Sequence, residues 1–117
     1  MKHRQNNRIL SRTREKRLAL MRQLGSQLLM QELLVTTEPR AKELKKFLEP
    51  LISNARKETT LHRRRQLTAQ IGQLAVEKLL SVGERMKTRP GGYIRLTKLT
   101  ISRGDGSQTV RVELIKE

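Results

Sequence analysis

The stretch LLVTTEPRAKELKKFLEPLISNA, residues 33–55, places a strand pattern directly before a helix pattern and so decides the fold class. Residues 33–37 become β-branched toward their end, which favours a short strand or an extended exit. Thr37 is expected to cap the following helix, with Pro39 in its first turn. Six apolar residues at helical spacing form the expected buried stripe of that helix: Ala41, Leu44, Leu48, Leu51, Ile52 and Ala55. Pro50 lies inside the stripe and is expected to bend or interrupt the helix, because proline removes a backbone donor.

Helical patterns also occur on both sides of this stretch. A helix is expected from Thr13 onward, with Ser11 or Thr13 as its cap. Its apolar face is built from Leu18, Leu20, Met21, Leu24, Leu28 and Leu29. A further helix is expected from about Leu61 to Leu80. Its buried side would consist of Leu67, Ile71, Leu74, Ala75 and Leu79.

The hydrophobic period changes from helical to alternating near the end of the chain. Residues 93–101 are rich in β-formers, and residues 109–115 alternate apolar and polar side chains. Between them, SRGDGS at 102–107 has the glycine and aspartate content of a hairpin turn, which explains its RGD triplet better than an adhesion motif does. The sequence therefore predicts an α+β fold in one domain, residues 13–117, preceded by a basic arm, residues 1–12.

The charge balance is the strongest functional signal in the chain. It holds 26 Lys and Arg residues against 11 acidic residues, for a net charge of +15. Such a chain attracts polyanions, so a nucleic acid or an anionic membrane surface is the expected partner. No apolar run approaches the length that spans a bilayer. Phe47 and Tyr93 are the only aromatic residues, which excludes a base-stacking platform on a sheet.

Residues typical of catalytic or metal sites are scarce. There is no cysteine, and His3 and His62 lie far apart in sequence without a clustered ligand set. Asp105 is the single aspartate and falls in the expected turn. Gly91 and Gly92 precede a strand instead of a helix, so they do not fit a phosphate-binding loop. We therefore expect neither an enzyme nor a bound metal or other cofactor.

Basic residues gather in the N-terminal arm and at the starts of the expected helices. Residues 1–12 contain no acid, and such a segment should be disordered alone and become ordered on a polyanion. Cations at a helix N-terminus oppose the helix dipole, unless an external anion binds there. The candidate contact residues in these segments are Lys2, His3, Arg4, Arg8, Arg12, Arg14, Lys16, Arg17, Arg22, His62, Arg63, Arg64 and Arg65.

The segment KTRPGGYIRLTK, residues 87–98, allows two interpretations. Glycines 91 and 92 let the backbone approach another surface closely or take a positive φ. Tyr93 and Arg95 should share one sheet face, with Lys98 on the other. One interpretation is a turn before an ordinary sheet edge, and the other is a contact to phosphate or sugar. The candidate residues for that contact are Arg89, Gly91, Gly92, Tyr93, Arg95 and Lys98.

Several motifs in this order resemble the L seventeen family of bacterial large-subunit ribosomal proteins. They are MKHR at the start, ELLVTTEPRAKELKKFLEPLISNARK at 32–57, RPGGYIRLTK at 89–98, and RGD followed by VELI near the end. The match runs nearly end to end. The chain departs from the family pattern at Asn6-Asn7, Ser11, Met86 and Leu96-Thr97.

The resemblance implies a two-layer α/β domain with three main helices against a three-stranded sheet. It also implies assembly onto 23S-type ribosomal RNA in the large subunit of the bacterial, cytoplasmic ribosome, beside the L thirty-two protein. The basic candidates would then be RNA-phosphate contacts in a structural role, with no membrane, small-molecule substrate or homo-oligomer expected.

Two other classes of protein compete with this one. The alternative function is a free-standing architectural protein that binds nucleic acid, with comparable affinity for duplex DNA. Binding to a membrane surface by the first helix is less well supported, because its basic residues surround the helix start instead of forming one stripe.

Overall fold

The computed structural model describes residues 13–57, 60–102 and 108–115, with the side chains of 100–102 left out of the description. Its elements, in chain order, are α1 (Arg14–Gln31), β1 (Leu33–Thr37), α2 (Glu38–Ala55), α3 (Leu61–Ile71), α4 (Gln73–Arg85), β2 (Ile94–Ser102) and β3 (Gln108–Leu114). The α+β class is confirmed. The predicted arm at 1–12 and the predicted turn with its RGD triplet lie outside the described residues.

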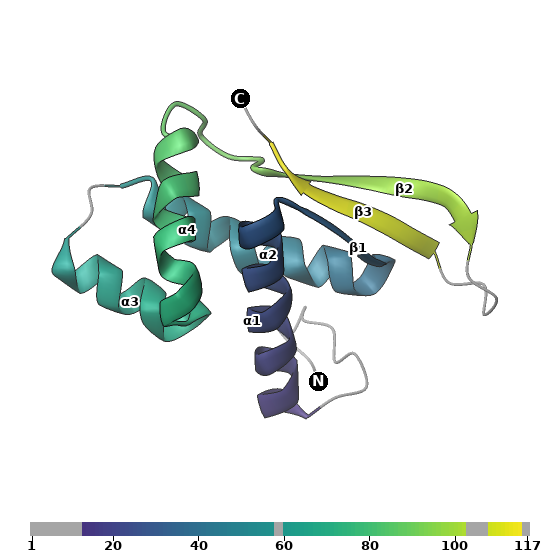
Figure 1. The fold of residues 1–117 in the computed structure, drawn as a ribbon, viewed down its shortest axis with the longest axis horizontal. Helices are drawn as coiled ribbons and strands as arrows, with labels where there is room; N and C mark the ends of the chain where they lie inside the picture. Colours follow the sequence, from purple (N-terminus) through teal and green to yellow (C-terminus); the bar gives the residue numbers. More distant parts are fainter. Residues whose placement is uncertain (1–12, 58–59, 103–107, 116–117) are drawn as a thin grey trace, which may run out of the picture.

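The three described strands form one antiparallel sheet in the order β1-β3-β2. The last strand of the chain is therefore central, with the strand that precedes α2 on one side and its hairpin partner on the other. Leu34 and Leu96 both lie opposite Val112, which is fully buried. α1 and α2 lie against this face of the sheet, and α2 touches all three strands. Figure 1 shows the sheet above these helices, with no described element covering its other face.

Leucine is the most frequent residue in the core of the described chain. All six residues of the stripe predicted for α2 are buried, which confirms that prediction. Each fully buried Leu or Ile side chain contributes about 1.5–3 kcal/mol of transfer free energy. Of the two effects predicted for Pro50, a bend or an interruption, the interruption does not occur, since α2 continues from Glu38 to Ala55. Pro50 is exposed, and the burial of Leu48 and Leu51 on either side of it holds the helix in place.

The helix expected from Leu61 to Leu80 is divided by Gly72. That residue has φ 99° and ψ 157°, a conformation that residues with a Cβ rarely adopt, and it separates α3 from α4. Because the chain changes direction there, the apolar pattern does not continue through it. Leu74, predicted to be buried, is 95% exposed, whereas Leu79 is fully buried. The described part of the chain thus has four helices, not the three that were expected.

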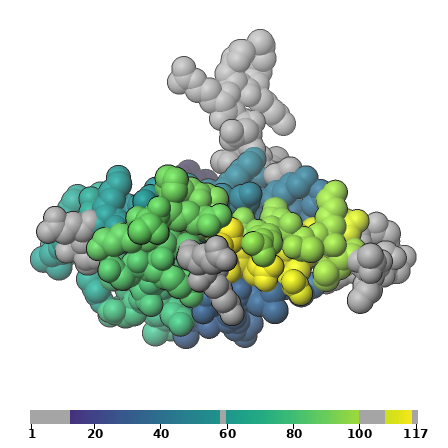
Figure 2. All heavy atoms as spheres, turned by 90° about the horizontal axis from the view of Figure 1, so that it is seen from above, coloured from purple at the N-terminus to yellow at the C-terminus, as the bar shows by residue number. Residues whose placement is uncertain are grey.

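α3 and α4 extend away from the sheet. Figure 1 shows α3 at the end of the molecule opposite the β2–β3 strands, with α4 between them. Figure 2 shows the same division from above, with the teal and green atoms of α3 and α4 at one end and the yellow atoms of β3 at the other. The molecule measures 46 × 36 × 27 Å along its principal axes, so its ends present separate surfaces.

α4 crosses the end of α2 at unusually close range, and Gly83 makes this crossing possible. Gly83 is buried, and a Cβ on it would lie 2.6 Å from both the carbonyl carbon and the carbonyl oxygen of Ala55. Real Cβ atoms do not approach backbone so closely. The crossing therefore requires glycine on α4 and a small residue, Ala55, on α2.

Replacing Gly83 with alanine tests this crossing. The added methyl group meets backbone atoms, which cannot turn aside as a flexible side chain can. We expect the free energy of unfolding to fall by about 1–3 kcal/mol, even though alanine is the better helix former. Urea denaturation of the purified protein measures the change.

Gly91→Ala is the matched control. No atom lies within 4 Å of the Cβ added there, and Gly91 does not have a positive φ, so its unfolding midpoint should equal that of the original chain. Equal midpoints for all three proteins would contradict the close crossing.

Candidate nucleic-acid interface

Arg56, the residue after α2, fixes the segment that joins α4 to β2. Its Nε donates to the Met86 carbonyl oxygen and its NH2 to the Lys87 carbonyl oxygen, each at 3.0 Å. Its NH1 donates to the Tyr93 hydroxyl oxygen at 3.0 Å, and the guanidinium carbon lies 5.8 Å from the centroid of the Tyr93 ring. The Glu49 carboxylate accepts the backbone N–H of Tyr93 at 2.8 Å. The side chains of Arg56 and Glu49 thus hold the two ends of the 86–93 segment in place.

Tyr93 is a core residue, which corrects its assignment as an RNA contact on the sheet surface. It is 2% exposed, and its hydroxyl faces Arg56. It precedes β2, where the strand pleat does not yet set side-chain direction, so the prediction that it shares a face with Arg95 is wrong. Arg95 is exposed and lies 3.9 Å from a Glu113 oxygen. Lys98 is also exposed, and it lies on the opposite face from Arg95, as predicted.

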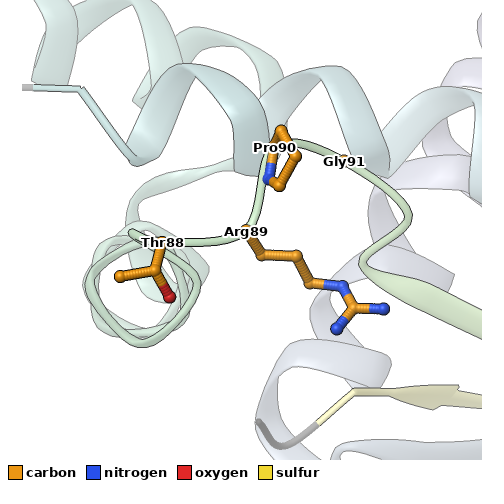
Figure 3. A pocket seen from close by; sticks show the side chains of 4 residues that line it. All are labelled: Thr88, Arg89, Pro90 and Gly91. Atoms are coloured by element: carbon orange, nitrogen blue, oxygen red, sulfur yellow. The ribbon is translucent and has the colours of Figure 1, made fainter.

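The glycine pair lies in an exposed loop. Thr88, Arg89, Pro90 and Gly91 line an open hollow of about 530 Å³, and their side chains are drawn in Figure 3. Arg89 stabilises the loop, because its Nε donates a hydrogen bond to the Gly92 carbonyl oxygen at 3.2 Å. Gly92 has φ 66°, which explains glycine at that position. Gly91 has no positive φ, and a methyl group placed on it would meet no atom within 4 Å, so the described fold does not itself require glycine there.

The start of α1 presents cations to solvent. Thr13 is its N-cap and accepts a hydrogen bond from the backbone N–H of Lys16 at 3.4 Å, as one of the two predicted caps. Arg14 and Lys16 are exposed, and neither makes a hydrogen bond through its side chain or an ion pair within the described ranges. Arg17, in the same turn, is half-buried.

Arg22, a predicted contact residue, is engaged by the fold. Its Nε donates to the Gln70 carbonyl oxygen and its NH2 to the Ala69 carbonyl oxygen, each at 3.2 Å. These carbonyl groups belong to the last turn of α3, where no backbone N–H group of the same helix is left to bond them. Arg22 therefore ties α1 to the end of α3, and its cation also suits the negative end of that helix dipole.

The first turn of α3 carries the second predicted basic group and no acidic residue. His62 and Arg65 are exposed, while Arg63 and Arg64 are half-buried. Arg64 forms an ion pair with Glu77 of α4. Arg65 has no side-chain hydrogen bond or ion pair to any residue that the structure describes.

The structure does not bring the predicted contact residues into one patch. Figure 1 places the start of α1, the start of α3 and the loop between α4 and β2 on separate sides of the molecule. The contact residues predicted in the arm, Lys2, His3, Arg4, Arg8 and Arg12, lie outside the described residues.

A basic hollow between α2 and β2 was not predicted. Lys42, Lys45 and Lys46 line it together with Glu49 and Leu96, and its volume is about 410 Å³. The signal for it was present in the sequence, since lysines at i, i+3 and i+4 share one face of a helix. The prediction for α2 rested on its apolar stripe and not on its opposite face.

Metal-ligating and membrane-spanning features are absent from the part of the chain that the structure describes. No group of three or more His, Cys, Asp or Glu side chains is placed to hold a metal ion there. No described helix combines the length and the apolar character that crossing a membrane requires.

Fold and surface together define the class: a small, strongly basic α+β domain whose described cations face outward on several sides. Comparison with known proteins is more specific. The family model for ribosomal protein L17 matches residues 20–115. Large ribosomal subunit protein bL17 of Gemmatimonas aurantiaca is 46% identical over 117 residues, covering 98% of each chain. The bL17 protein of a Wolbachia strain from Drosophila simulans is 41% identical over 118 residues, covering 98% of this chain and 83% of the relative. The chain belongs to the ribosomal protein L17 family.

Replacing Arg56 with methionine tests its role in holding the 86–93 segment. The change removes three hydrogen bonds, each worth on the order of 1 kcal/mol, while keeping an extended side chain. We expect a loss of about 2 kcal/mol in the free energy of unfolding, measured by urea denaturation. Tyr93→Phe removes only the hydrogen bond from Arg56 to the tyrosine hydroxyl. Its free energy of unfolding should fall by about 1 kcal/mol, and its affinity for RNA should be unchanged. A Tyr93→Phe protein of full stability but weakened RNA binding would show that the hydroxyl serves an external ligand instead.

Proposed function

We propose that this protein is a structural constituent of the bacterial large ribosomal subunit, where it binds and stabilises folded 23S-type ribosomal RNA. The observation that carries the proposal is the placement of exposed cations, without partners among the described residues, at the N-terminal ends of two helices. Arg14 and Lys16 occupy this position on α1, and Arg65 occupies it on α3. Family membership supports the proposal, because both curated relatives carry the name of a large ribosomal subunit protein.

The charge arrangement at α3 is unfavourable for the protein alone. Residues 62–65 have four basic or histidine side chains and the first turn has no acid, although the helix N-terminus is already the positive end of the dipole. Glu77 of α4 offsets part of this charge by pairing with Arg64. An RNA phosphate at this end would be attracted by both the dipole and the side chains. Arginine suits the contact, since its planar fork can bond two phosphate oxygens. The first turn of α3 is thus better matched to a bound polyanion than to solvent.

The distribution of cations supports a bridging role. Contacts on separate sides of a small domain allow several RNA segments to pack against it, and each neutralised phosphate releases condensed counterions. The chain has only two aromatic residues, of which Tyr93 is buried, so recognition should depend on RNA shape and backbone instead of base stacking. In this proposal the arm at 1–12 becomes ordered between RNA segments, and the folded domain fixes its position.

The 88–91 loop offers a further RNA contact. Arg89 and Gly92 hold the loop shape, while the space around Gly91 is open. A residue without a side chain at that point lets a phosphate or sugar reach the backbone amides. Catalysis and cofactors have no part in the proposed role.

A neighbouring ribosomal protein of the L thirty-two type is the proposed protein contact. The face of the sheet that no described element covers supports such a contact, because Leu33 and Val35 of its edge strand are 44% and 49% exposed. Exposed apolar side chains beside polar ones are typical of surfaces that pack against another protein.

A free-standing architectural protein that binds duplex DNA is the second candidate, favoured only by the net charge of +15. Competition between duplex DNA and a folded large-subunit RNA fragment distinguishes the two functions. The ribosomal role predicts that RNA displaces DNA at equal phosphate concentration. Equal competition by the two nucleic acids would favour the architectural role.

The double variant Arg14→Gln, Arg65→Gln tests the proposed RNA contacts. If each arginine neutralises one phosphate, the slope of log K against log salt should become shallower by about 1.4, at about 0.7 per phosphate in single-stranded regions. Filter binding to the folded RNA fragment over a range of salt concentrations measures the slope.

Arg111→Gln provides a control, since Arg111 lies 3.7 Å from Glu113 on the sheet and has no assigned RNA contact. Its slope should match that of the original chain. A double variant with an unchanged slope would remove the two helix starts from the RNA interface.

A further inference from the structure

Three lysines of α2 form a basic surface to which no function has been assigned. Lys42, Lys45 and Lys46 lie on one face of the helix and line the hollow between α2 and β2, which Leu96 completes from the strand. We propose that this hollow, the α2–β2 groove, is a separate phosphate-binding site that takes the sugar-phosphate backbone of an RNA segment. The inference rests on the proposed function and adds a contact surface to it.

The lysines are unequally neutralised by the protein itself. Lys42 lies 2.7 Å from a Glu38 oxygen and Lys46 lies 3.5 Å from a Glu43 oxygen, both along α2. Lys45 is half-buried and has no side-chain hydrogen bond or ion pair within the described chain. A partly desolvated ammonium group without a partner is unfavourable, and an external anion would compensate it.

The groove also contains one acidic side chain, which has a structural role. Glu49 lines the hollow, but its Oε2 accepts the Tyr93 backbone N–H at 2.8 Å and is therefore engaged in holding the loop. Glu43 is 7% exposed, and its carboxylate lies 3.5 Å from the Lys46 ammonium group, so its charge partly offsets that lysine. Lys45 is therefore the lysine of the groove that forms no ion pair with a described acidic side chain, and an occupant that contacts its ammonium group should be anionic.

The arrangement of the cations suits a linear polyanion more than a single small ion. Lys42 and Lys46 are separated by about 6 Å along the axis of α2, from the rise of 1.5 Å per residue. Lys98 lies two residues beyond Leu96 on the same face of β2, about 6.6 Å further along the strand, and is exposed. The strand that contributes Leu96 to the groove therefore carries a cation beyond the lining residues. The hollow is open and has no aromatic side chain among its lining residues, which fits a sugar-phosphate backbone and not a stacked base.

The double variant Lys45→Gln, Lys46→Gln tests the site in the full chain with a folded large-subunit RNA fragment. Loss of two phosphate contacts should make the salt slope shallower by about 1.4. The matched control is Lys57→Gln with Arg111→Gln, which removes the same charge from exposed side chains that do not line the groove and have no assigned RNA contact. The control should keep the original slope, and Lys45→Arg with Lys46→Arg, which retains both charges, should keep it too.

A second measurement uses the unaltered protein and so does not depend on how the variants fold. An amine-modifying reagent is applied with and without the RNA fragment, and the modified lysines are identified by mass spectrometry. Lys45 and Lys46 should be protected by RNA, whereas Lys57, which is exposed and has no assigned RNA contact, should be modified equally in both samples.

The outcomes separate this inference from the proposed function. If the original chain fails to bind the RNA fragment, the proposed function fails. If the original chain binds but the groove variant keeps its slope and Lys45 and Lys46 are not protected, the groove inference alone is wrong. Protection of these lysines by whole large subunits but not by complete large-subunit RNA free of protein would identify a protein as the occupant and overturn the RNA assignment.

Discussion

The close crossing of α4 over the end of α2 is the constraint on which the rest of the structure depends. Because Gly83 lets the two backbones meet at Ala55, the end of α4 lies beside Arg56. That arginine then donates to the carbonyl oxygens that follow α4 and holds Tyr93 in the core. The position of Tyr93 sets where β2 starts. The absence of a Cβ at Gly83 thus influences the helix packing, the position of the exposed loop and the start of the sheet strand β2.

The basic residues of this chain serve two different purposes, which their number alone does not reveal. Arg22 and Arg56 bond backbone carbonyl groups near helix ends, and Arg85 lies 2.6 Å from a Glu32 oxygen at the end of α1. These three arginines join elements that are distant in sequence. Arg65 and Lys45 instead have no side-chain partner in the described residues. The count of 26 Lys and Arg residues therefore overstates the number of basic side chains that are available to a polyanion.

Local sequence signals were sufficient for much of the fold. The strand at 33–37, the buried stripe of α2, the cap at Thr13 and the strands of the terminal hairpin each depend on nearby residues, and the structure confirms them. The break at Gly72 was missed because an isolated glycine is compatible with a helical pattern on both sides. Pro50 was expected to bend or interrupt α2, yet the helix runs through it, with buried neighbours on both sides.

The candidate site was predictable only in part, because it depends on contacts between distant parts of the chain. Tyr93 was assigned to the surface because its partner Arg56 is 37 residues away, beyond the reach of any local pattern. The lysines of α2 were visible in the sequence, but their meeting with Leu96 depends on the helix–sheet contact.

A double-mutant cycle between Gly83→Ala and Arg56→Met, measured by urea denaturation, tests the dependence of the arginine contacts on the helix crossing most directly. If the crossing positions Arg56, the alanine variant has already weakened its hydrogen bonds, and the double variant should lose less stability than the sum of the single variants. We predict a coupling of at least about 1 kcal/mol, within the range seen for residues in one network. Additive losses would show that the two features act independently and would contradict this dependence.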